Sequence, residues 1–133
     1  MPSTYTLIAV ALGGSAGALA RFAMVSLTQQ WASQHSFWQS LPLGTWLVNI
    51  LGSCVIGILY ILLTEKLLLA ESWRPLLVVG FLGAFTTFSS FSLETLQLLE
   101  RGMALQALLY TLSSVLFCLL ACWLGMALTR ALA

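Results

Sequence analysis

Charged and catalytic side chains are scarce in this chain. Asp, Glu, Lys and Arg make up only 7% of it, there is no Asp, and His35 is the single histidine. A soluble domain carries about 25% charged residues, so this composition indicates a membrane protein. Intramembrane proteolysis needs paired aspartates, a zinc motif such as HExxH or a serine with a base, and the one His is in a loop. We therefore expect no enzymatic activity.

Metal-type cysteine motifs and basic clusters are also missing. The three cysteines, Cys54, Cys118 and Cys122, fall in apolar stretches without CxxC spacing, which makes disulfide or metal roles unlikely and favours packing. The net charge is +1 and no Lys/Arg cluster is present. Nucleic-acid binding and electrostatic binding to a membrane surface both need such clusters, so neither is expected.

What the chain does contain is four long apolar stretches. A bilayer core about 30 Å thick needs roughly 20 apolar residues per helix, and the stretches that satisfy this are Tyr5–Leu27, Leu43–Thr64, Pro75–Leu93 and Met103–Thr129. They predict an all-α integral membrane protein with a single domain, residues 1–133, and helices at approximately 4–29, 43–65, 75–100 and 103–131. Residues 18–20 resemble a signal cleavage site, but no basic flank precedes them, so we expect a retained first helix.

The distribution of Lys and Arg gives almost no orientation signal. With four spans, one side of the membrane receives Lys66, Arg74 and Arg130, and the other receives Arg101 and Arg21. Because the Lys/Arg imbalance of short loops normally sets orientation, this near tie is compatible with insertion in both directions. An antiparallel homodimer could then supply the inverted repeat around which many transporters are built. One fixed orientation remains the alternative.

The segment from Gly80 to Ser92 is unusual for a helix at membrane depth. Phe88 and Phe91 share one helix face, because residues three apart are neighbours on a helix. Aromatic stripes usually pack against other helices, whereas phenyl edges, which carry partial positive charge, suit an anion pathway when hydroxyl donors accompany them. The pathway interpretation is favoured by the interleaved hydroxyls, which are Thr86, Thr87, Ser89, Ser90 and Ser92.

Two glycines in the same segment predict a broken third helix. Gly80 and Gly83 precede Thr86-Thr87, so we expect the helical hydrogen-bond ladder to open there and expose backbone carbonyls. Non-helical backbone at membrane depth is tolerated only when it is buried in protein or lines a cavity. Unwound carbonyls of this kind coordinate Na⁺ in discontinuous helices.

Polar residues on the second and fourth helices add to a possible pathway. Asn49 is an amide at membrane depth and needs a partner, so we expect it to face protein or water and to line the pathway. Tyr110, Ser114 and Cys118 are spaced by four residues and form a shallow polar rail on one helix face. The alternative for the rail is hydroxyls that bond to the preceding turn of their own helix.

Two charged residues near these positions are further candidates. Arg21 is the only cation inside a predicted span, and intramembrane charges are functional candidates by default. A structural anchor and an anion-attracting role are equally compatible with its place near the helix end. Glu94 follows the hydroxyl-rich run, where we expect a structural or vestibule partner rather than direct contact with an ion.

Three motifs resemble those of the Fluc (CrcB-type) fluoride channels of bacteria. They are GGSAGALARF at residues 13–22, GTWLVNILGS at 44–53 and GAFTTFSSFSLE at 83–94, of which the third is the most specific. The resemblance extends over all four helices. It implies passive fluoride export across the bacterial inner membrane by a multi-pass, dual-topology homodimer with two antiparallel pores.

The resemblance also implies roles for individual residues. A structural Na⁺ at the dimer interface would be held by the backbone carbonyls of Gly83 and Thr86 from both subunits. Arg21 and Glu94 match vestibule or structural charges. The fluoride pore would be formed by Asn49, Phe88, Phe91, Tyr110, Ser114 and Cys118. The residue pattern adds Ser89 and Ser90 as pore candidates without deciding which of them faces the pathway.

Two positions depart from the family pattern. Cys118 stands where a hydroxyl is expected and offers only a weak S–H donor. Ala84 stands where a second glycine is common, which makes the helix break stiffer.

The main rival function is that of a small multidrug or cation–proton exchanger, a class of protein that also has four helices. Such exchangers need a carboxylate in the middle of the first helix, and this chain has none there.

Overall fold

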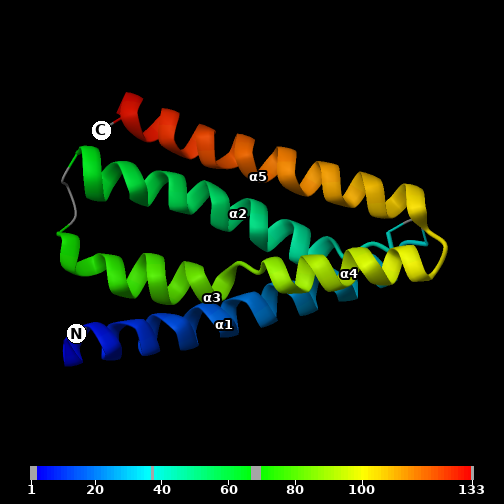
Figure 1. The fold of residues 1–133 in the computed structure, drawn as a ribbon, viewed down its shortest axis with the longest axis horizontal. Coiled ribbons are helices and arrows are strands. Elements are labelled where there is room, and N and C mark those ends of the chain that lie inside the picture. The colour runs from blue at the N-terminus through cyan, green and yellow to red at the C-terminus, as the bar shows by residue number, and fades with distance from the viewer. Residues whose placement is uncertain (1–2, 37, 67–69, 133) are drawn as a thin grey trace.

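The described part of the chain folds into four long apolar helices that run roughly side by side (Figure 1). The computed structural model describes residues 3–36, 38–66 and 70–132. The first helix is α1, Thr4–Ser33, and the fourth is α5, Ala104–Leu132. The second consists of α2, Leu43–Tyr60, continued by a π-helical turn, η1, Ile61–Glu65. The predicted all-α membrane architecture is confirmed, with helices one and two extending close to the predicted bounds.

The third helix consists of several segments. In chain order they are the 3-10 turn η2 (Glu71–Trp73), the π-helical η3 (Pro75–Leu82), α3 (Gly83–Phe85) and α4 (Phe88–Glu100). Thr86 and Thr87 have extended backbones, with φ/ψ of −87°/157° and −153°/118°. The predicted break is confirmed, but its position differs: Gly83 keeps helical angles of −61° and −32° and Gly80 lies inside η3. The two threonines form the break, since both remain extended between two helical segments.

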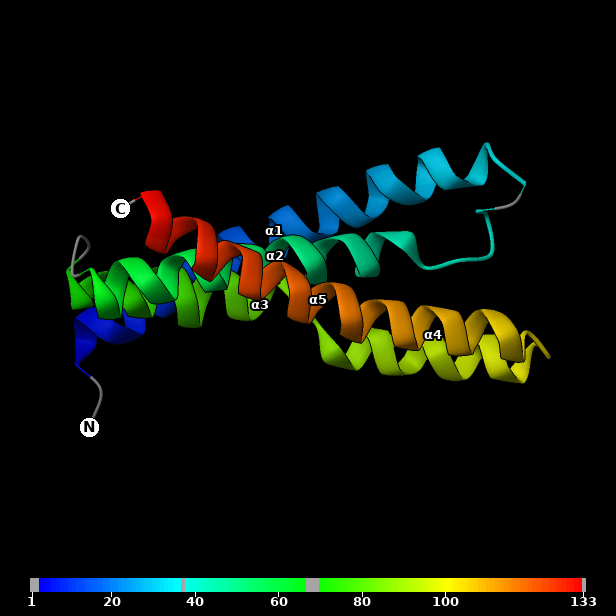
Figure 2. The same ribbon diagram turned by 90° about the horizontal axis from the view of Figure 1, so that it is seen from above.

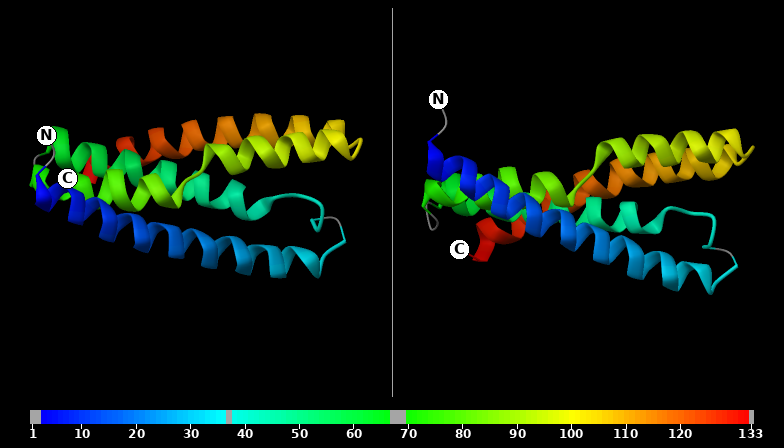
Figure 3. Two further views of the ribbon diagram at one scale, coloured as in Figure 1. Left: turned by 60° about the horizontal axis from the view of Figure 1, so that its bottom comes forward. Right: turned by 90° about the horizontal axis from the view of Figure 1, so that it is seen from below.

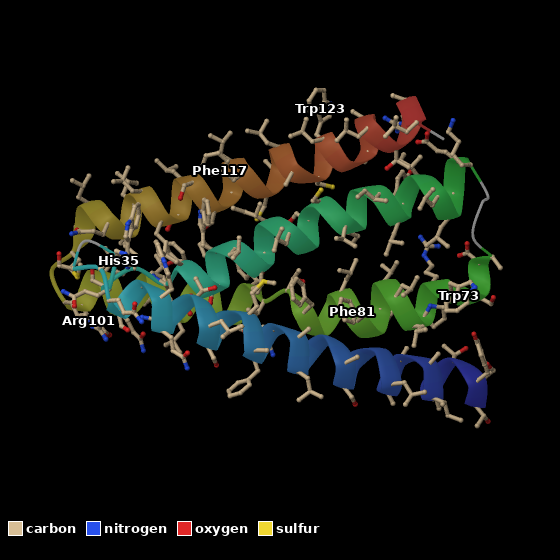
Figure 4. All side chains as sticks on the ribbon, turned by 180° about the vertical axis from the view of Figure 1, so that it is seen from behind. His35, Trp73, Phe81, Arg101, Phe117 and Trp123 are labelled. Atoms are coloured by element: carbon tan, nitrogen blue, oxygen red, sulfur yellow. The ribbon has the colours of Figure 1, made fainter. Side chains whose placement is uncertain are left out.

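The ends of the bundle are arranged as four spans predict. The start of α1, the end of η1, the start of η2 and the end of α5 lie at one end, and the end of α1, the start of α2 and the turn from α4 to α5 lie at the opposite end (Figure 1). At the terminal end, Arg130 on α5 binds the Glu65 carboxylate through Nε at 2.8 Å and Nη2 at 2.5 Å. Trp73 marks the same end in Figure 4, whereas His35 and Arg101 mark the other. Polar and aromatic residues therefore gather at both ends of an apolar bundle.

A tight turn joins α4 to α5 and sets these helices side by side. Gly102 has φ +73°, which a residue with a side chain rarely adopts. Its N–H donates to the Leu99 carbonyl, and the Met103 N–H donates to the Leu98 carbonyl, both at 2.9 Å. This is the Schellman pattern, in which a glycine ends a helix and an apolar contact follows. Met103 packs on the cluster that contains Leu98 and thereby supplies that contact.

Glycines allow close approach between two pairs of helices. A Cβ on Gly57 of α2 would lie 2.3 Å from the Cys122 carbonyl of α5, and one on Gly125 of α5 would lie 2.3 Å from the Cys54 carbonyl of α2. On α1, a Cβ on Gly17 would lie 2.1 Å from the Phe81 carbonyl of η3. Small residues let backbones touch in this way where no hydrophobic force drives helices together in lipid. The glycines thus fix α2 on α5 and α1 on η3.

The helices separate toward the end that lacks the termini. Figures 2 and 3 show α4 running beside the first half of α5, and this pair diverging from α1 and α2. Two hydrogen bonds bridge the pairs where they part: Thr45 donates to Glu94 at 2.7 Å, and the Trp46 indole donates to Ser113 at 3.2 Å. The branch point is therefore held by polar contacts rather than by glycine packing.

We expect Gly57→Ala to destabilise the protein by about 1–3 kcal/mol, because the added methyl group forces α2 away from α5. Gly14→Ala is the matched control, since a Cβ there meets nothing within 4 Å. Thermal unfolding of the purified protein in detergent measures both variants. Equal melting temperatures for Gly57→Ala, Gly14→Ala and the wild type would contradict the proposed close packing.

Candidate functional site

A cavity of about 370 Å³ lies beside the break in the third helix. It is lined by α2, the third helix and α5 and is open on one side. Its wall includes seven residues predicted for the site, which are Asn49, Gly83, Thr86, Phe88, Phe91, Ser114 and Cys118. The third helix supplies four of them within a few residues, and the close contact of α2 with α5 brings the others to the same space. The fold therefore gathers most of the predicted cation and pore residues around one cavity.

Asn49 fastens the break to α2. Its Oδ1 accepts the Thr87 N–H at 2.8 Å, and its Nδ2 donates to the Thr87 carbonyl at 3.0 Å. Because the backbone N–H must meet an oxygen, these two bonds also fix which way the carboxamide faces. Asn49 thus lines the cavity and also satisfies the extended backbone at membrane depth, and its place on an ion pathway stays a prediction.

Hydroxyl groups cap the start of α4. The Thr87 Oγ1 accepts the Ser90 N–H at 3.2 Å, and it lies 3.2 Å from the Ser89 Oγ and 3.1 Å from the Ser90 Oγ. This is an N-cap, in which a side-chain oxygen satisfies a donor of the first helical turn. Neither Ser89 nor Ser90 is among the residues that line the cavity. In the structure these two serines belong to the capping group of α4.

The two predicted pore phenylalanines differ sharply in exposure. Phe88 is 78% exposed, whereas Phe91 is 9% exposed. Their ring centroids lie 5.4 Å apart at an interplanar angle of 45°, and Phe91 lies 5.4 Å from the Tyr110 ring at 44°. These tilted geometries direct ring edges as well as faces toward neighbouring groups. A continuous aromatic row therefore runs from the open side of the protomer to the buried Tyr110.

The rail on α5 divides between two environments. Ser114 and Cys118 line the cavity, whereas Tyr110 is buried and its hydroxyl donates to the Glu94 Oε2 at 2.9 Å. The Ser114 Oγ is a buried side-chain oxygen for which the described residues supply no hydrogen-bond partner. Buried hydroxyls are normally paired, so an orphan beside a cavity indicates a place for a polar ligand.

Glu94 lies inside the third helix, and hydroxyl groups from α2 and α5 hold its carboxylate. It lies within α4, which continues to Glu100. Thr45 donates to its Oε1 at 2.7 Å and Tyr110 donates to its Oε2 at 2.9 Å. Both carboxylate oxygens are thereby engaged by protein. This supports the expected role as a structural or vestibule partner.

A second, polar cavity lies toward the end of the bundle that lacks the termini. It measures about 190 Å³ and is lined by α1, the segment that precedes α2, and α4 with the turn that follows it. Its wall includes Glu94 and Arg101, together with the amides Gln29, Gln39 and Gln97. Glu94 therefore faces this cavity while its partner Tyr110 contacts Phe91, which lines the first cavity. A chain of three contacting side chains, Glu94, Tyr110 and Phe91, therefore extends from the wall of one cavity to the wall of the other.

Sequence reasoning missed several residues of the site. Arg101 was considered only for membrane orientation, and Thr45 and Trp46 were not singled out. Thr45 binds Glu94 directly, and Trp46 donates to Ser113, whose hydroxyl in turn donates to the Tyr110 carbonyl at 3.2 Å. The signal for Thr45 was its place one helical turn before Asn49, which puts both on one face of α2. No comparable signal marked Trp46, because its partner is 67 residues away.

Arg21 is separate from both cavities. It is half-buried on α1 and is not among the residues that line either space. The ion pairs within the described ranges join Arg74 to Glu71 and Arg130 to Glu65. The structure therefore brings no carboxylate into ion-pair contact with Arg21, and its role remains a prediction.

The site offers hydrogen-bond donors, phenyl edges and freed carbonyls rather than catalytic groups. Hydroxyl, thiol and amide groups around the cavity can replace part of the hydration shell of a small anion. At the break, the C-terminal end of α3 presents carbonyls and the N-terminal end of α4 presents amides, the arrangement by which discontinuous membrane helices bind ions of both signs. The chemistry available is therefore ion binding and passage.

Comparison with known proteins agrees with this chemistry. The family model described as CrcB-like protein, Camphor Resistance (CrcB), matches residues 8–126. A protein named fluoride-specific ion channel FluC from Magnetococcus marinus is 48% identical over 91% of this chain and 94% of its own length. Its namesake from Saccharophagus degradans is 41% identical over 99% of this chain and 96% of its own length. Another from Methylococcus capsulatus is 46% identical over 96% of this chain, which spans 54% of that protein. The chain therefore belongs to the CrcB/FluC fluoride channel family.

Proposed function

We propose that this protein is a fluoride-specific ion channel that exports fluoride passively across the bacterial inner membrane. Relatives named as fluoride-specific channels match at least 91% of the chain. Within the chain itself, the observation that carries the proposal is the buried and unpartnered Ser114 hydroxyl. It lines the same cavity as Phe88 and Phe91, so a donor and phenyl edges converge on one space.

This combination suits fluoride in particular. A small anion holds its water strongly, so a pathway must replace the hydration shell while still binding the ion weakly enough to release it. Hydroxyls, an amide and ring edges carry partial charges only, and the described residues place no Lys or Arg in the cavity wall. A deep cation would trap the ion, whereas these groups favour passage.

The route we propose runs between the two cavities. Arg101 at the polar cavity attracts the anion from solution, and the hydroxyls of Tyr110 and Ser114 lie along the way to the cavity beside the break. Phe88 and Phe91 direct their edges to the ion, and Cys118 extends the row with a weak donor. Asn49, Ser89 and Ser90 add polar groups at the break, and Glu94 orients the Tyr110 hydroxyl.

The functional unit we propose is an antiparallel homodimer with dual topology. Phe88 is 78% exposed and Gly83 is also exposed in the single protomer, on the side where the cavity lies. A second copy in the inverted orientation would cover this side and complete a symmetric pair of pores. The near tie of Lys and Arg between the two ends permits both orientations of insertion.

A structural Na⁺ between the two protomers is part of this proposal. The carbonyls of Gly83 and Thr86 belong to the last turn of α3, where a helix leaves its carbonyls without intrahelical donors. Oxygen ligands of this kind fit a hard cation, and unwound carbonyls bind Na⁺ in other discontinuous helices. When bound, the Na⁺ would offset the carbonyl dipoles that the two broken helices direct at each other.

The rival cation–proton exchanger finds little support. Glu94 is the carboxylate closest to the cavities, and Thr45 and Tyr110 hold both of its oxygens. On α1, which would carry the exchanger's carboxylate, the sequence has no acidic residue. The two functions also differ in charge movement, since a channel passes the anion alone whereas an exchanger couples its transport to protons.

Purified protein in potassium-loaded liposomes should release fluoride rapidly once valinomycin balances the charge, and chloride barely faster than protein-free liposomes do. A fluoride electrode and a chloride electrode follow the two ions under identical conditions. We expect valinomycin to be required because fluoride leaves without a coupled ion, so a K⁺ current must balance its charge. Equal efflux of both anions, or fluoride efflux that depends on a proton gradient instead of valinomycin, would count against the channel.

Replacing Phe88 with Ile should lower fluoride flux by about tenfold or more, which corresponds to about 1.4 kcal/mol on the barrier. Isoleucine keeps an apolar side chain but lacks the positive ring edge. Phe22→Ile is the matched control, because Phe22 is 72% exposed on α1, away from the cavity. If both variants conduct like the wild type, Phe88 has only a packing role.

Lysines added at one end of the bundle should force the protein to insert into the membrane in a single orientation. Ala70→Lys with Ser72→Lys adds positive charge at the terminal end, and Ser33→Lys with Gln34→Lys adds it at the other end, so each pair should enforce one orientation. Each biased variant expressed alone should then fail to relieve fluoride sensitivity in a channel-deficient bacterium, whereas their co-expression should restore resistance. Full resistance from either variant alone would refute dual topology.

A further inference from the structure

The two carbonyls assigned to Na⁺ share a feature of their hydrogen bonding. In a continuous helix, the Gly83 carbonyl would accept the Thr87 N–H, and the Thr86 carbonyl would accept the Ser90 N–H. Both of these donors are diverted to side chains: Thr87 N–H donates to the Asn49 Oδ1 at 2.8 Å, and Ser90 N–H donates to the Thr87 Oγ1 at 3.2 Å. Each proposed ligand is thus free because a side chain has taken its helical partner.

The two diversions differ in origin. The Thr87 hydroxyl is a local N-cap and belongs to the helix that it starts. Asn49 comes from another helix, 38 residues earlier in the chain, and makes a second bond from its Nδ2 to the Thr87 carbonyl at 3.0 Å. We call these two hydrogen bonds the Asn49 bridge. Because Thr87 is extended, the carboxamide pairs with its backbone much as a neighbouring β-strand would.

Removal of the bridge would leave a strong donor unpaired. The Thr87 residue is 9% exposed, and a buried N–H at membrane depth must find an acceptor within the protein. The Gly83 carbonyl is the acceptor that helical geometry offers to this N–H. Closing that bond would extend α3 by one residue and occupy a carbonyl proposed as a cation ligand.

We propose that Asn49 is a positioning residue for the Na⁺ site, because its bridge to Thr87 keeps the Gly83 carbonyl available. The inference rests on the proposed structural Na⁺ and goes beyond it, since it assigns control of that site to a side chain of the fluoride pathway. One amide then connects the two ion sites: it lines the cavity and holds open the break that supplies the cation's ligands. Asn49 itself need not touch the cation.

Two substitutions separate this role from simple pore lining. Asn49→Leu has similar volume and removes both bonds of the bridge. Asn49→Asp keeps an oxygen that accepts the Thr87 N–H, loses the donor to the Thr87 carbonyl, and places negative charge where an anion would pass. Ser53→Ala is the matched control, because Ser53 lines the same cavity one turn further along α2 and takes no part in the bridge.

The test measures melting temperature in detergent as choline is replaced by Na⁺ at constant ionic strength, since binding to the folded state raises the melting temperature. Circular dichroism and gel filtration verify that each variant is helical and monodisperse. We expect Asn49→Leu to raise the half-saturating Na⁺ concentration by about tenfold or more, as loss of an outer-shell partner does at other metal sites. Asn49→Asp and Ser53→Ala should stay within about threefold of the wild type.

Fluoride flux through the same proteins supplies the second readout. Asn49→Asp should lose most flux while it keeps its Na⁺ response, whereas Asn49→Leu should lose sensitivity to Na⁺; a purely pore-lining role would leave the Na⁺ response of both variants unchanged. The inference is overturned if Asn49→Leu responds to Na⁺ like the wild type. If Asn49→Leu does not fold, Asn49→Asp decides, because a folded Asp variant without Na⁺ response refutes the bridge. A wild type indifferent to Na⁺ would instead remove the proposed cation site itself.

Discussion

A helix can be interrupted at membrane depth only if the protein satisfies the backbone groups that the interruption releases. Thr86 and Thr87 create such an interruption in the middle of the third helix. The N–H and the carbonyl of Thr87 are both met by Asn49, and the first turn of α4 is met by the Thr87 hydroxyl. Carbonyls at the end of α3 remain open. The break thereby exposes unsatisfied acceptors toward a cavity while its own backbone stays paired.

This arrangement depends on how α2 is placed. Asn49 reaches Thr87 only because α2 lies close to the third helix, and α2 is held against α5 by the reciprocal contacts of Gly57 and Gly125. A Cβ on Gly52, also on α2, would lie 2.2 Å from the Thr86 Cγ2, so the helix passes directly beside the break. Small residues therefore do more than pack helices here, since they bring a polar side chain within reach of exposed backbone.

The polar groups of the site form a connected set rather than isolated contacts. Thr45 and Tyr110 hold the Glu94 carboxylate, and Trp46 reaches the same turn of α5 through Ser113. In a medium of low polarity such bonds are hard to break, because no water replaces a lost partner. Ser114 is the exception, a buried hydroxyl that its protein neighbours leave unpaired. A rigid, satisfied frame around one free donor is well suited to brief contact with a passing anion.

Composition and residue spacing were enough to predict the membrane architecture, the existence of a break and the chemical character of the site. Long apolar runs, scarce charge and the hydroxyl-rich segment of 83–94 are local properties, so composition and helical spacing are enough to recognise them. Spacing also put Ser114 and Cys118 on one face of α5, where both line the cavity. The family resemblance identified fluoride, which the residue pattern alone narrowed only to an anion.

Which residues meet depends on how the helices pack. The glycines predict a break that begins at Gly83, yet Gly83 stays helical and the chain opens at Thr86 and Thr87, where the distant Asn49 captures the Thr87 N–H. Ser89 and Ser90 cap α4 outside the cavity lining, and Thr45, Trp46 and Arg101 join the site although neither motif nor spacing assigned them a role there. The reason is physical: helical periodicity assigns a residue to a face, whereas its partner depends on how closely another helix approaches that face and at what height.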